Sequence, residues 1–347
     1  MKKALALLLL FCLLLTAGMQ NAARAESEAS ATSTPPSMPT PTAISVILSA
    51  VSPSPTPTPA LTPSPSPAKT PTPEPTPFTI VWMSDTQNMT RDQVDVLDSM
   101  RDWILANREK ENIQFVIHTG DVIDGFTPAM FENAAAFLVP ILEMLPGMVV
   151  SGNHDVSKDG SQWYFTQRPY AQLVQKEGQT YRDGAACYVT FRAGGTDFLV
   201  FGIGYSISCP GWMQQIISEH PEHVVITVIH SGMAENGHIS GPMKAILQEV
   251  APLSPRFRLM LCGHMRGSAT RIDRFDDDHD GEKERSVTTM MFNYQEDRVN
   301  GLGFLRLLRF DPLTRSIEVS TYSPWFDQWG YPKTTDQENH FILENAW

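Results

Sequence analysis

Five short polar clusters follow apolar segments of the chain at separate points. They contain carboxylates, amides and imidazoles, which are side chains that bind divalent metal ions or transfer protons. In α/β sheets, ligands bind at the edge where the strands end, so we expect the clusters to converge on one site. The clusters are Asp85-Thr86-Gln87, Gly120-Asp121-Val122-Ile123-Asp124, Gly152-Asn153-His154-Asp155, His230 and Gly263-His264-Met265-Arg266.

In this order the clusters resemble the five signature blocks of the calcineurin-like metallophosphoesterase superfamily, over nearly all of residues 78–347. The GDxxD and GNHD blocks are the specific ones, because each follows an apolar strand pattern in the right order. The first and last blocks depart from the usual DxH and GHxH at Gln87 and Arg266. The resemblance implies hydrolysis of phosphoesters with two divalent cations about 4 Å apart, which activate water and neutralise developing charge.

The resemblance assigns one metal ion to four residues that all match the family pattern: Asp121, Asn153, His230 and His264. His230 receives this role from its place among the other blocks. A mixed oxygen and nitrogen ligand set suits Mn, Fe, Zn or Ni better than Ca, which prefers oxygen alone. We therefore expect one tightly bound transition metal.

A second metal ion is assigned to Asp85, to Asp121 as the bridging ligand, and to positions 87 and 266. Gln87 can offer its amide oxygen, whereas Arg266 carries only donors and a permanent charge and cannot be a ligand. We expect weaker binding of this metal, with Arg266 making a forked contact to Asp85 or to a phosphate oxygen. In the alternative, Arg266 turns to solvent, and the other three side chains and water still hold the metal.

His154 matches the catalytic histidine of the family, which is not a ligand. It is expected to protonate the leaving oxygen or hold the phosphate, and Asp124 matches the carboxylate that orients it. Asp155 is expected to support the loop. Residues 276–281 read DxDxDG, the first half of a calcium loop, but Val287 stands where a glutamate should close it. We interpret that segment as a solvated hairpin tip rather than a calcium site.

Strand and helix patterns alternate in a way that delivers these clusters. Apolar runs predict strands at residues 78–83, 113–118, 147–150, 188–191, 198–202 and 257–262. Helical spacing predicts helices at 90–110 and 127–145, in a helix–strand unit at 212–230, and at 243–250. The chain reads as β-rich from residue 269, with strands at 288–292, 304–310 and 317–321. The resemblance implies a four-layer α/β/β/α sandwich of two mixed sheets.

The first 77 residues have a different composition. Residues 1–25 have a charged start, an apolar run and an Ala-Arg-Ala end, which predict a signal peptide cleaved before Glu26. Residues 26–77 hold 15 of the 27 prolines, so we expect a disordered, extended linker. These patterns predict a secreted protein, held at the cell surface, with a metallophosphoesterase domain at 78–347. The apolar run is too short to span a membrane, and the mature chain shows no transmembrane segment.

The composition of residues 78–347 limits the classes of binding partner and the number of disulfides that we expect. Residues 78–347 contain 22 Lys and Arg against 35 Asp and Glu, which argues against specific nucleic-acid binding. Three cysteines remain after signal cleavage, and an oxidising compartment permits one disulfide, which we predict between Cys187 and Cys209. Cys262 is expected to be a small core residue.

The leading hypothesis is a secreted metal-dependent phosphoesterase that hydrolyses a phosphomonoester or phosphodiester by metal-activated water. Its expected partners are a small-molecule or polymer phosphoester and, through the linker, a cell wall. The main alternative is a catalytically impaired surface binding protein that retains the fold and one metal. A second alternative is a hydrolase that acts through one metal on another bond, such as a pyrophosphate.

Overall fold

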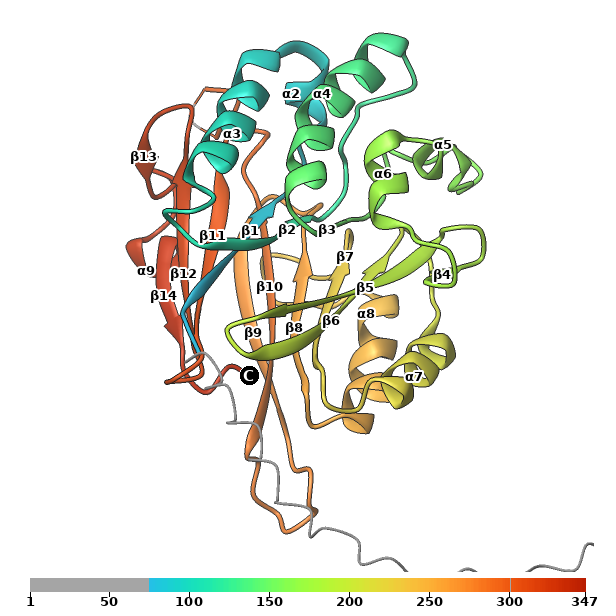
Figure 1. The fold of residues 1–347 in the computed structure, drawn as a ribbon, viewed down its shortest axis with the longest axis vertical. Helices are drawn as coiled ribbons and strands as arrows, with labels where there is room; N and C mark the ends of the chain where they lie inside the picture. Colours follow the sequence, from blue (N-terminus) through green and yellow to red (C-terminus); the bar gives the residue numbers. More distant parts are fainter. Residues whose placement is uncertain (1–74, 300) are drawn as a thin grey trace, which may run out of the picture. The chain divides into compact units, whose positions relative to one another are not determined.

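The computed structural model describes residues 75–299 and 301–347 (Figure 1). The predicted signal peptide, and the predicted linker except for its last three residues, lie outside the described residues. Two seven-stranded sheets form the centre of the described part. No helix among the described residues is both long and apolar enough to cross a membrane.

The first sheet is mixed and has the order β13-β12-β11-β1-β2-β3, with β14 also paired to β12. Its three N-terminal strands run parallel, and the C-terminal strands are added antiparallel through the β1–β11 pair. The strands are β1 (Phe78–Met83), β2 (Ile113–His118), β3 (Gly147–Val149), β11 (Leu305–Asp311), β12 (Ser316–Ser323), β13 (Gln328–Trp329) and β14 (His340–Leu343).

The second sheet has the order β4-β5-β6-β7-β8-β10-β9 and is also mixed. Strands β6, β7, β8 and β10 are parallel neighbours, and hairpins lie at both ends. The strands are β4 (Thr180–Tyr181), β5 (Ala186–Ala193), β6 (Thr196–Ile203), β7 (Val224–Ile229), β8 (Phe257–Cys262), β9 (Gly267–Phe275) and β10 (Arg285–Asn293).

Helices cover the outer face of each sheet, and one hydrophobic core fills the space between the sheets. The predicted four-layer sandwich is therefore confirmed. On the first sheet lie α2 (Gln87–Asp92), α3 (Val94–Asn107), α4 (Pro128–Met144), α5 (Trp163–Thr166) and α6 (Pro169–Val174). On the second lie α7 (Pro210–Glu219), α8 (Gly241–Ala245) and two short turns at Ile246–Val250 and Ala251–Leu253. The last helix, α9 (Asp336–Asn339), precedes β14.

The apolar run of β1 shows why the central strands could be read from sequence. Ile80 and Trp82 point between the sheets, where Trp82 packs edge-on against Phe292 at 4.6 Å between ring centroids. Val81 and Met83 point to the helices on the other face. A strand covered on both faces has no polar side, so it appears as a continuous apolar segment.

The predicted helix at 90–110 is wrong in one respect, because two helices occupy this region. Gln93 is non-helical, with φ −139° and ψ 54°, and separates α2 from α3. Helix α2 begins three residues earlier than predicted, since the main-chain N–H of Gln87 donates to the carbonyl of Asp121 at 2.9 Å. This bond ties the first polar cluster to the second.

The predicted Cys187–Cys209 disulfide is wrong, because both thiols are free and buried. Cys187 lies in the core between the two sheets, next to the sulfur of Met148. Cys209 lies just before α7, in the core on the opposite face of the second sheet. The sheet separates the two side chains. Cys262 is fully buried, as predicted.

The DxDxDG segment forms the tip of the β9–β10 hairpin, as predicted. Asp278 and Asp280 are exposed, and their carboxylates lie within 4.8 Å of each other and of that of Asp276. Val287, the residue in the closing position of the calcium-loop pattern, is a buried β10 residue paired with Asp273 on β9.

Candidate metal centre

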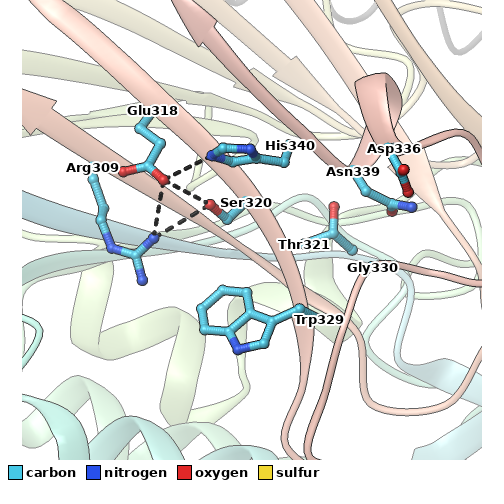
Figure 2. A pocket seen from close by; sticks show the side chains of 9 residues that line it. All are labelled: Arg309, Glu318, Ser320, Thr321, Trp329, Gly330, Asp336, Asn339 and His340. Atoms are coloured by element: carbon cyan, nitrogen blue, oxygen red, sulfur yellow. Dashed lines mark hydrogen bonds and ion pairs between the residues drawn. The ribbon is translucent and has the colours of Figure 1, made fainter.

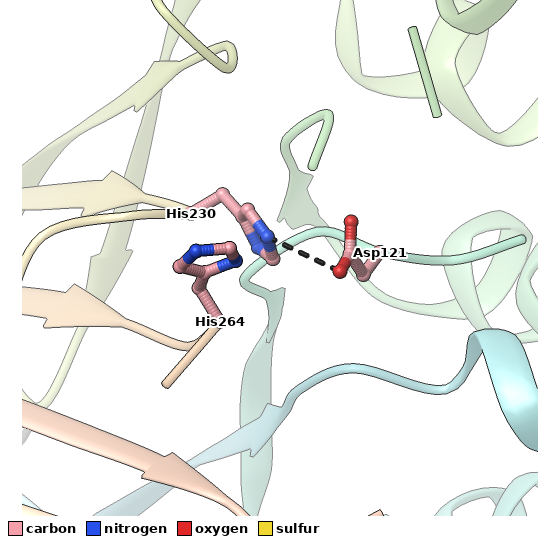
Figure 3. A group of neighbouring side chains, drawn as sticks. All are labelled: Asp121, His230 and His264. Carbon is pink, nitrogen blue, oxygen red and sulfur yellow. Dashed lines mark ion pairs between the residues drawn. The ribbon is translucent and has the colours of Figure 1, made fainter. Parts of the chain in front are cut away.

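The polar clusters converge where strands of both sheets end. Asp85 follows β1 and Asp121 follows β2, whereas His230 and His264 follow β7 and β8 of the other sheet. Figure 3 shows Asp121, His230 and His264 approaching one another from three separate chain segments. One ligand atom from each of these three residues lies within 4.8 Å of the others.

His230 is the centre of the contacts in this group. Its Nε2 lies 3.3 Å from Oδ2 of Asp121 and 3.0 Å from Oδ1 of Asn153. Its Nδ1 lies 2.9 Å from the carbonyl of Thr119, which fixes the orientation of the ring. The ring centroid of His264 is 4.9 Å away. The structure thus brings together all four residues predicted to bind the first metal.

Asp85 and Gln87 lie next to this group. The amide nitrogen of Gln87 donates to Oδ2 of Asp121 at 3.1 Å. The carboxylate of Asp85 accepts the main-chain N–H of His264 at 3.1 Å and the hydroxyl of Ser84. Four of the six predicted metal ligands are therefore joined in two hydrogen-bonded pairs, Gln87 with Asp121 and His264 with Asp85.

The backbone at the site is unusual. Asp85, Asp121 and His264 have φ values of 51°, 53° and 66°, in the left-handed region that non-glycine residues seldom adopt. Such conformations persist where surrounding structure enforces them, and they gather at functional sites. Here they turn each side chain back toward the strand ends immediately after its strand finishes.

Steric contacts explain why the GNHD block begins with a glycine. A side chain at Gly152 would overlap the carboxylate and main-chain nitrogen of Asp121. Gly263 is constrained in the same way by Asp85 and Ser84. The glycines of these two blocks thus allow the backbone of one loop to approach the carboxylate delivered by another.

The charges at this point favour a bound cation. Burial raises the pKa of Asp85 to about 7, and the neighbouring Asp121 carboxylate contributes to the rise. Burial alone would lower the pKa of His230, but the carboxylates of Asp121 and Asp85 outweigh it and raise that pKa to about 9. Two buried carboxylates side by side create a negative potential that stabilises positive charge.

A second functional pair lies beside the ligand group. Nδ1 of His154 is 2.8 Å from Oδ1 of Asp124, and the His154 side chain is 41% exposed. Asp124 also forms an ion pair with Arg91 from α2 through its other oxygen. The main-chain N–H of His154 donates to Asp121 at 3.0 Å, so the pair is held next to the candidate metal ligands.

Comparison with known proteins agrees with this geometry. The family model described as calcineurin-like phosphoesterase matches residues 78–265, which include every residue of the site except Arg266. The chain belongs to the calcineurin-like phosphoesterase family. This family is metal-dependent and acts on phosphate esters.

One curated protein is similar in sequence to most of this chain. The Bacillus subtilis (strain 168) protein named "Uncharacterized protein YvnB" is 32% identical over 270 residues, covering 76% of this chain. The match covers 21% of YvnB, so this chain spans about a fifth of that protein.

Two solved structures are also similar. A conserved uncharacterized protein of Streptococcus pneumoniae TIGR4, a predicted phosphoesterase, is 13% identical with a TM-score of 0.35, covering 78% of this chain and 98% of its own. GAP50, the anchor in the inner membrane complex of Plasmodium, is 12% identical with a TM-score of 0.42, covering 77% and 88%.

The residues present fit the metal ions that a calcineurin-like phosphoesterase needs. The side-chain oxygen of Gln87 is buried and has no hydrogen-bond partner among the described residues. A buried acceptor without a partner is costly unless a cation or water meets it. Burial lowers the pKa of His264, which favours the neutral form of the ring that a metal ligand needs.

Arg266 is placed differently from the main sequence prediction. Its side chain is 75% exposed and forms an ion pair with Glu296 at 3.1 Å, so the predicted forked contact with Asp85 is not formed. The position of Arg266 in the alternative, turned to solvent, is the one observed. Burying a guanidinium beside a cation site costs free energy that a solvent-exposed partner avoids.

This position yields a prediction about the second metal. Because Arg266 leaves Asp85, Gln87 and Asp121 without a fourth protein ligand, we expect the wild type to bind one metal tightly and a second weakly. Arg266→His should tighten the second site by about 10- to 100-fold, a range typical for changes in metal surroundings. Titration of the metal-stripped protein with Mn²⁺, followed by calorimetry, measures both sites. Arg256→His, which changes a half-buried arginine paired with Glu222, is the control. Two equally tight sites in the wild type would contradict this expectation.

His118 is a supporting residue that the sequence analysis missed. His118, at the end of β2, lies 3.0 Å from the hydroxyl of Thr86 and accepts the N–H of Gly120, and burial lowers its pKa to about 3. It therefore stays neutral and holds two of the loops in place. Its signal was a histidine at the end of an apolar strand, directly before a ligand block.

Asp155 supports the loop as predicted. It accepts three main-chain N–H groups, from Val122, Ile123 and Gly152. These bonds join the loop after β2 to the loop after β3, so Asp155 fixes the distance between Asp121 and Asn153.

Proposed function

We propose that this chain is a secreted phosphoesterase that hydrolyses a phosphomonoester or phosphodiester with the help of bound transition metal. The observation that carries the proposal is the juxtaposition of two sets of groups. A buried ligand set of Asp121, Asn153, His230 and His264 lies beside an accessible His154–Asp124 pair. The first set can hold a cation and the second can transfer a proton. The two sets are adjacent, because the main-chain N–H of His154 donates to Asp121.

Each residue of the site has a distinct task in this proposal. The metal ions, when bound, supply Lewis acidity and an activated water. Asp121 contacts both predicted ligand groups, so it is the residue placed to serve both ions. His154 donates a proton to the leaving oxygen, and Asp124 holds the ring so that the other nitrogen, Nε2, faces the substrate.

Arg91 completes the second pair. Its guanidinium binds the free oxygen of Asp124 and also the side-chain oxygen of Asn88. A carboxylate held from two sides has fewer orientations, so the His154 ring is preorganised before substrate arrives. Asp92 and Asn88 link Arg91 to Arg298, which places a second cation on the same surface.

Location and substrate belong to the proposal as well. The charged start, apolar run and small-residue end of residues 1–25 support secretion, and the proline-rich composition of residues 26–77 supports a spacer to a cell surface. A secreted enzyme meets soluble phosphoesters and phosphorylated polymers, and these are the proposed substrates. The acidic composition of residues 78–347 disfavours nucleic acid as a specific partner.

The alternative of a binding protein with one metal and no turnover rests on Gln87 and Arg266, which depart from the family pattern. Purified mature chain should be supplied in turn with Mn²⁺, Fe²⁺, Zn²⁺ and Ni²⁺ and offered p-nitrophenyl phosphate, bis(p-nitrophenyl) phosphate and pyrophosphate. We expect hydrolysis of at least one ester, lost on chelation and restored by metal. Stoichiometric metal without any hydrolysis would favour the binding protein, and hydrolysis of pyrophosphate alone would favour the one-metal hydrolase.

A further inference from the structure

A pocket of about 520 Å³ opens on the outer face of the first sheet, and none of the candidate metal ligands lines it. It lies over β11, β12, β13 and β14, in the C-terminal part of the chain (Figure 2). Strands β13 and β14 both pair with β12 but meet different parts of it, at Tyr322–Ser323 and at Ile317–Ser320. The pocket lies where the two short strands leave the surface open between them.

Strand register explains why polar side chains gather here. Residues opposite one another in antiparallel strands point to the same face of a sheet. Arg309 is paired with Glu318, and His340 with Ser320, so these four side chains share a face. Ile317 and Val319 alternate with them and fill the core between the sheets, so the shared face is the outer one.

The side chains on one wall form a connected hydrogen-bond network. Oε1 of Glu318 lies 2.9 Å from Nε2 of His340 and 3.5 Å from the hydroxyl of Ser320. Arg309 lies 3.9 Å from Glu318, donates to Ser320 at 3.3 Å and binds Glu111 at 3.0 Å. Each group is therefore already oriented, which lowers the entropy cost of binding a ligand.

The opposite wall is the indole ring of Trp329. Figure 2 shows this ring across the pocket from Glu318, Ser320 and His340. The residue is 56% exposed, although a large apolar side chain gains free energy from burial. Its ring is held by Tyr322, with centroids 4.7 Å apart, and Tyr322 packs on Trp103 at 5.1 Å. Trp329 is a fixed and accessible flat surface.

Charge indicates which ligand suits these walls. Two carboxylates, those of Glu318 and Asp336, line the pocket with one guanidinium, and that guanidinium is already paired with Glu111 and Glu318, so a phosphate or other anion would be repelled. A cation would compete with the Arg309 guanidinium, which already lies 5.5 Å from the centroid of the Trp329 ring. A neutral ligand with an apolar face and a rim of hydroxyl groups matches both walls.

We propose that this pocket binds a neutral saccharide. A pyranose ring places its C–H face on Trp329, and its hydroxyl groups exchange hydrogen bonds with Glu318, Ser320 and Asp336. Hydroxyl groups both donate and accept, so they can join a network that already pairs acidic and basic groups. The proposal is independent of the phosphoester reaction, because the pocket and the candidate metal centre share no residue among those named for either.

The test uses the mature chain and saturation-transfer NMR with three neutral saccharides, cellotetraose, mannotriose and chitotriose. We expect transfer to the ring protons of at least one of them. Trp329→Ala should weaken that affinity by about tenfold or more, as for aromatic residues that dominate binding. Trp163→Ala is the matched control, since Trp163 on α5 is 58% exposed and lies outside the pocket.

A second variant tests the polar wall of the pocket in a protein whose fold is checked separately. Glu318→Gln keeps the shape of the wall but removes its charge, and it should weaken binding several-fold while thermal unfolding confirms the fold. The proposal is overturned if no saccharide shows transfer, or if Trp329→Ala leaves the affinity unchanged. Binding of choline or of tetralysine in place of the saccharides would also overturn it, because a cation would then be the ligand.

Discussion

Replacing Asp121 with alanine should remove bound metal and reduce phosphoester hydrolysis by on the order of 10³-fold or more. A metal ion supplies several kcal/mol of transition-state stabilisation, and each 1.36 kcal/mol is a factor of ten in rate. Asp121 contacts both His230 and Gln87, so its loss removes a carboxylate shared by the two predicted ligand sets. His264→Ala should have the same effect on the tighter site. Metal content by mass spectrometry and kcat/KM on the best ester measure the two consequences separately.

The matched control for this prediction is Asp278→Ala, which removes an exposed carboxylate on the β9–β10 hairpin tip. Its metal content in the tight site and its rate should equal those of the wild type. If the Asp121→Ala and His264→Ala proteins keep full metal content, the assignment of the candidate metal centre is wrong. If they lose metal and keep activity, the metal has no part in turnover.

His154→Ala should lower kcat by roughly 10²- to 10⁴-fold and leave metal content unchanged, because general acid–base groups contribute that range. The ring contacts Asp124 through Nδ1, whereas it is the main-chain N–H of His154, kept in the alanine variant, that donates to Asp121. The loss should be greatest for esters with poor leaving groups, which need a proton at the departing oxygen. Esters with good leaving groups, such as p-nitrophenyl phosphate, should be less affected.

His279→Ala, at the exposed hairpin tip, controls for the loss of an accessible imidazole. Asp124→Asn tests the orienting role, and it should reduce kcat less than His154→Ala does. An unchanged rate on an alkyl phosphate in His154→Ala would show that the ring is not the acid. Metal loss in that variant would instead make His154 part of the ligand set.

The sequence was most informative where both faces of a strand are covered. The strands at 78–83, 113–118 and 257–262 were predicted with their observed bounds, because burial on both sides leaves a continuous apolar run. The polar clusters stood out against these runs, and the structure brings the residues predicted as ligands close to one another. Strand β9 was not delimited, since it is half-exposed and carries arginine and aspartate between its buried residues.

Other features depend on long-range contacts that no local pattern encodes. The early start of α2 goes with the bond between Gln87 and the loop after β2, formed by residues far apart in sequence. The direction of the Arg266 side chain depends on Glu296, which only the tertiary fold brings near. The pocket at Trp329 requires two short strands to share one edge of β12. Each strand is too short to show the alternation of apolar and polar residues that identifies a strand in sequence.

The origin of the ligands has a consequence for the stability of the two-sheet sandwich. Asp85, Asp121 and Asn153 come from loops of one sheet, whereas His230 and His264 come from the other. A metal ion bound by both sets of residues would cross-link the two sheets, because separating the sheets would break its coordination. A ligand that binds only the folded state stabilises that state by an amount set by its concentration and affinity. Under the proposed function as a secreted enzyme, the external metal supply would then control both how much protein is active and how long it stays folded.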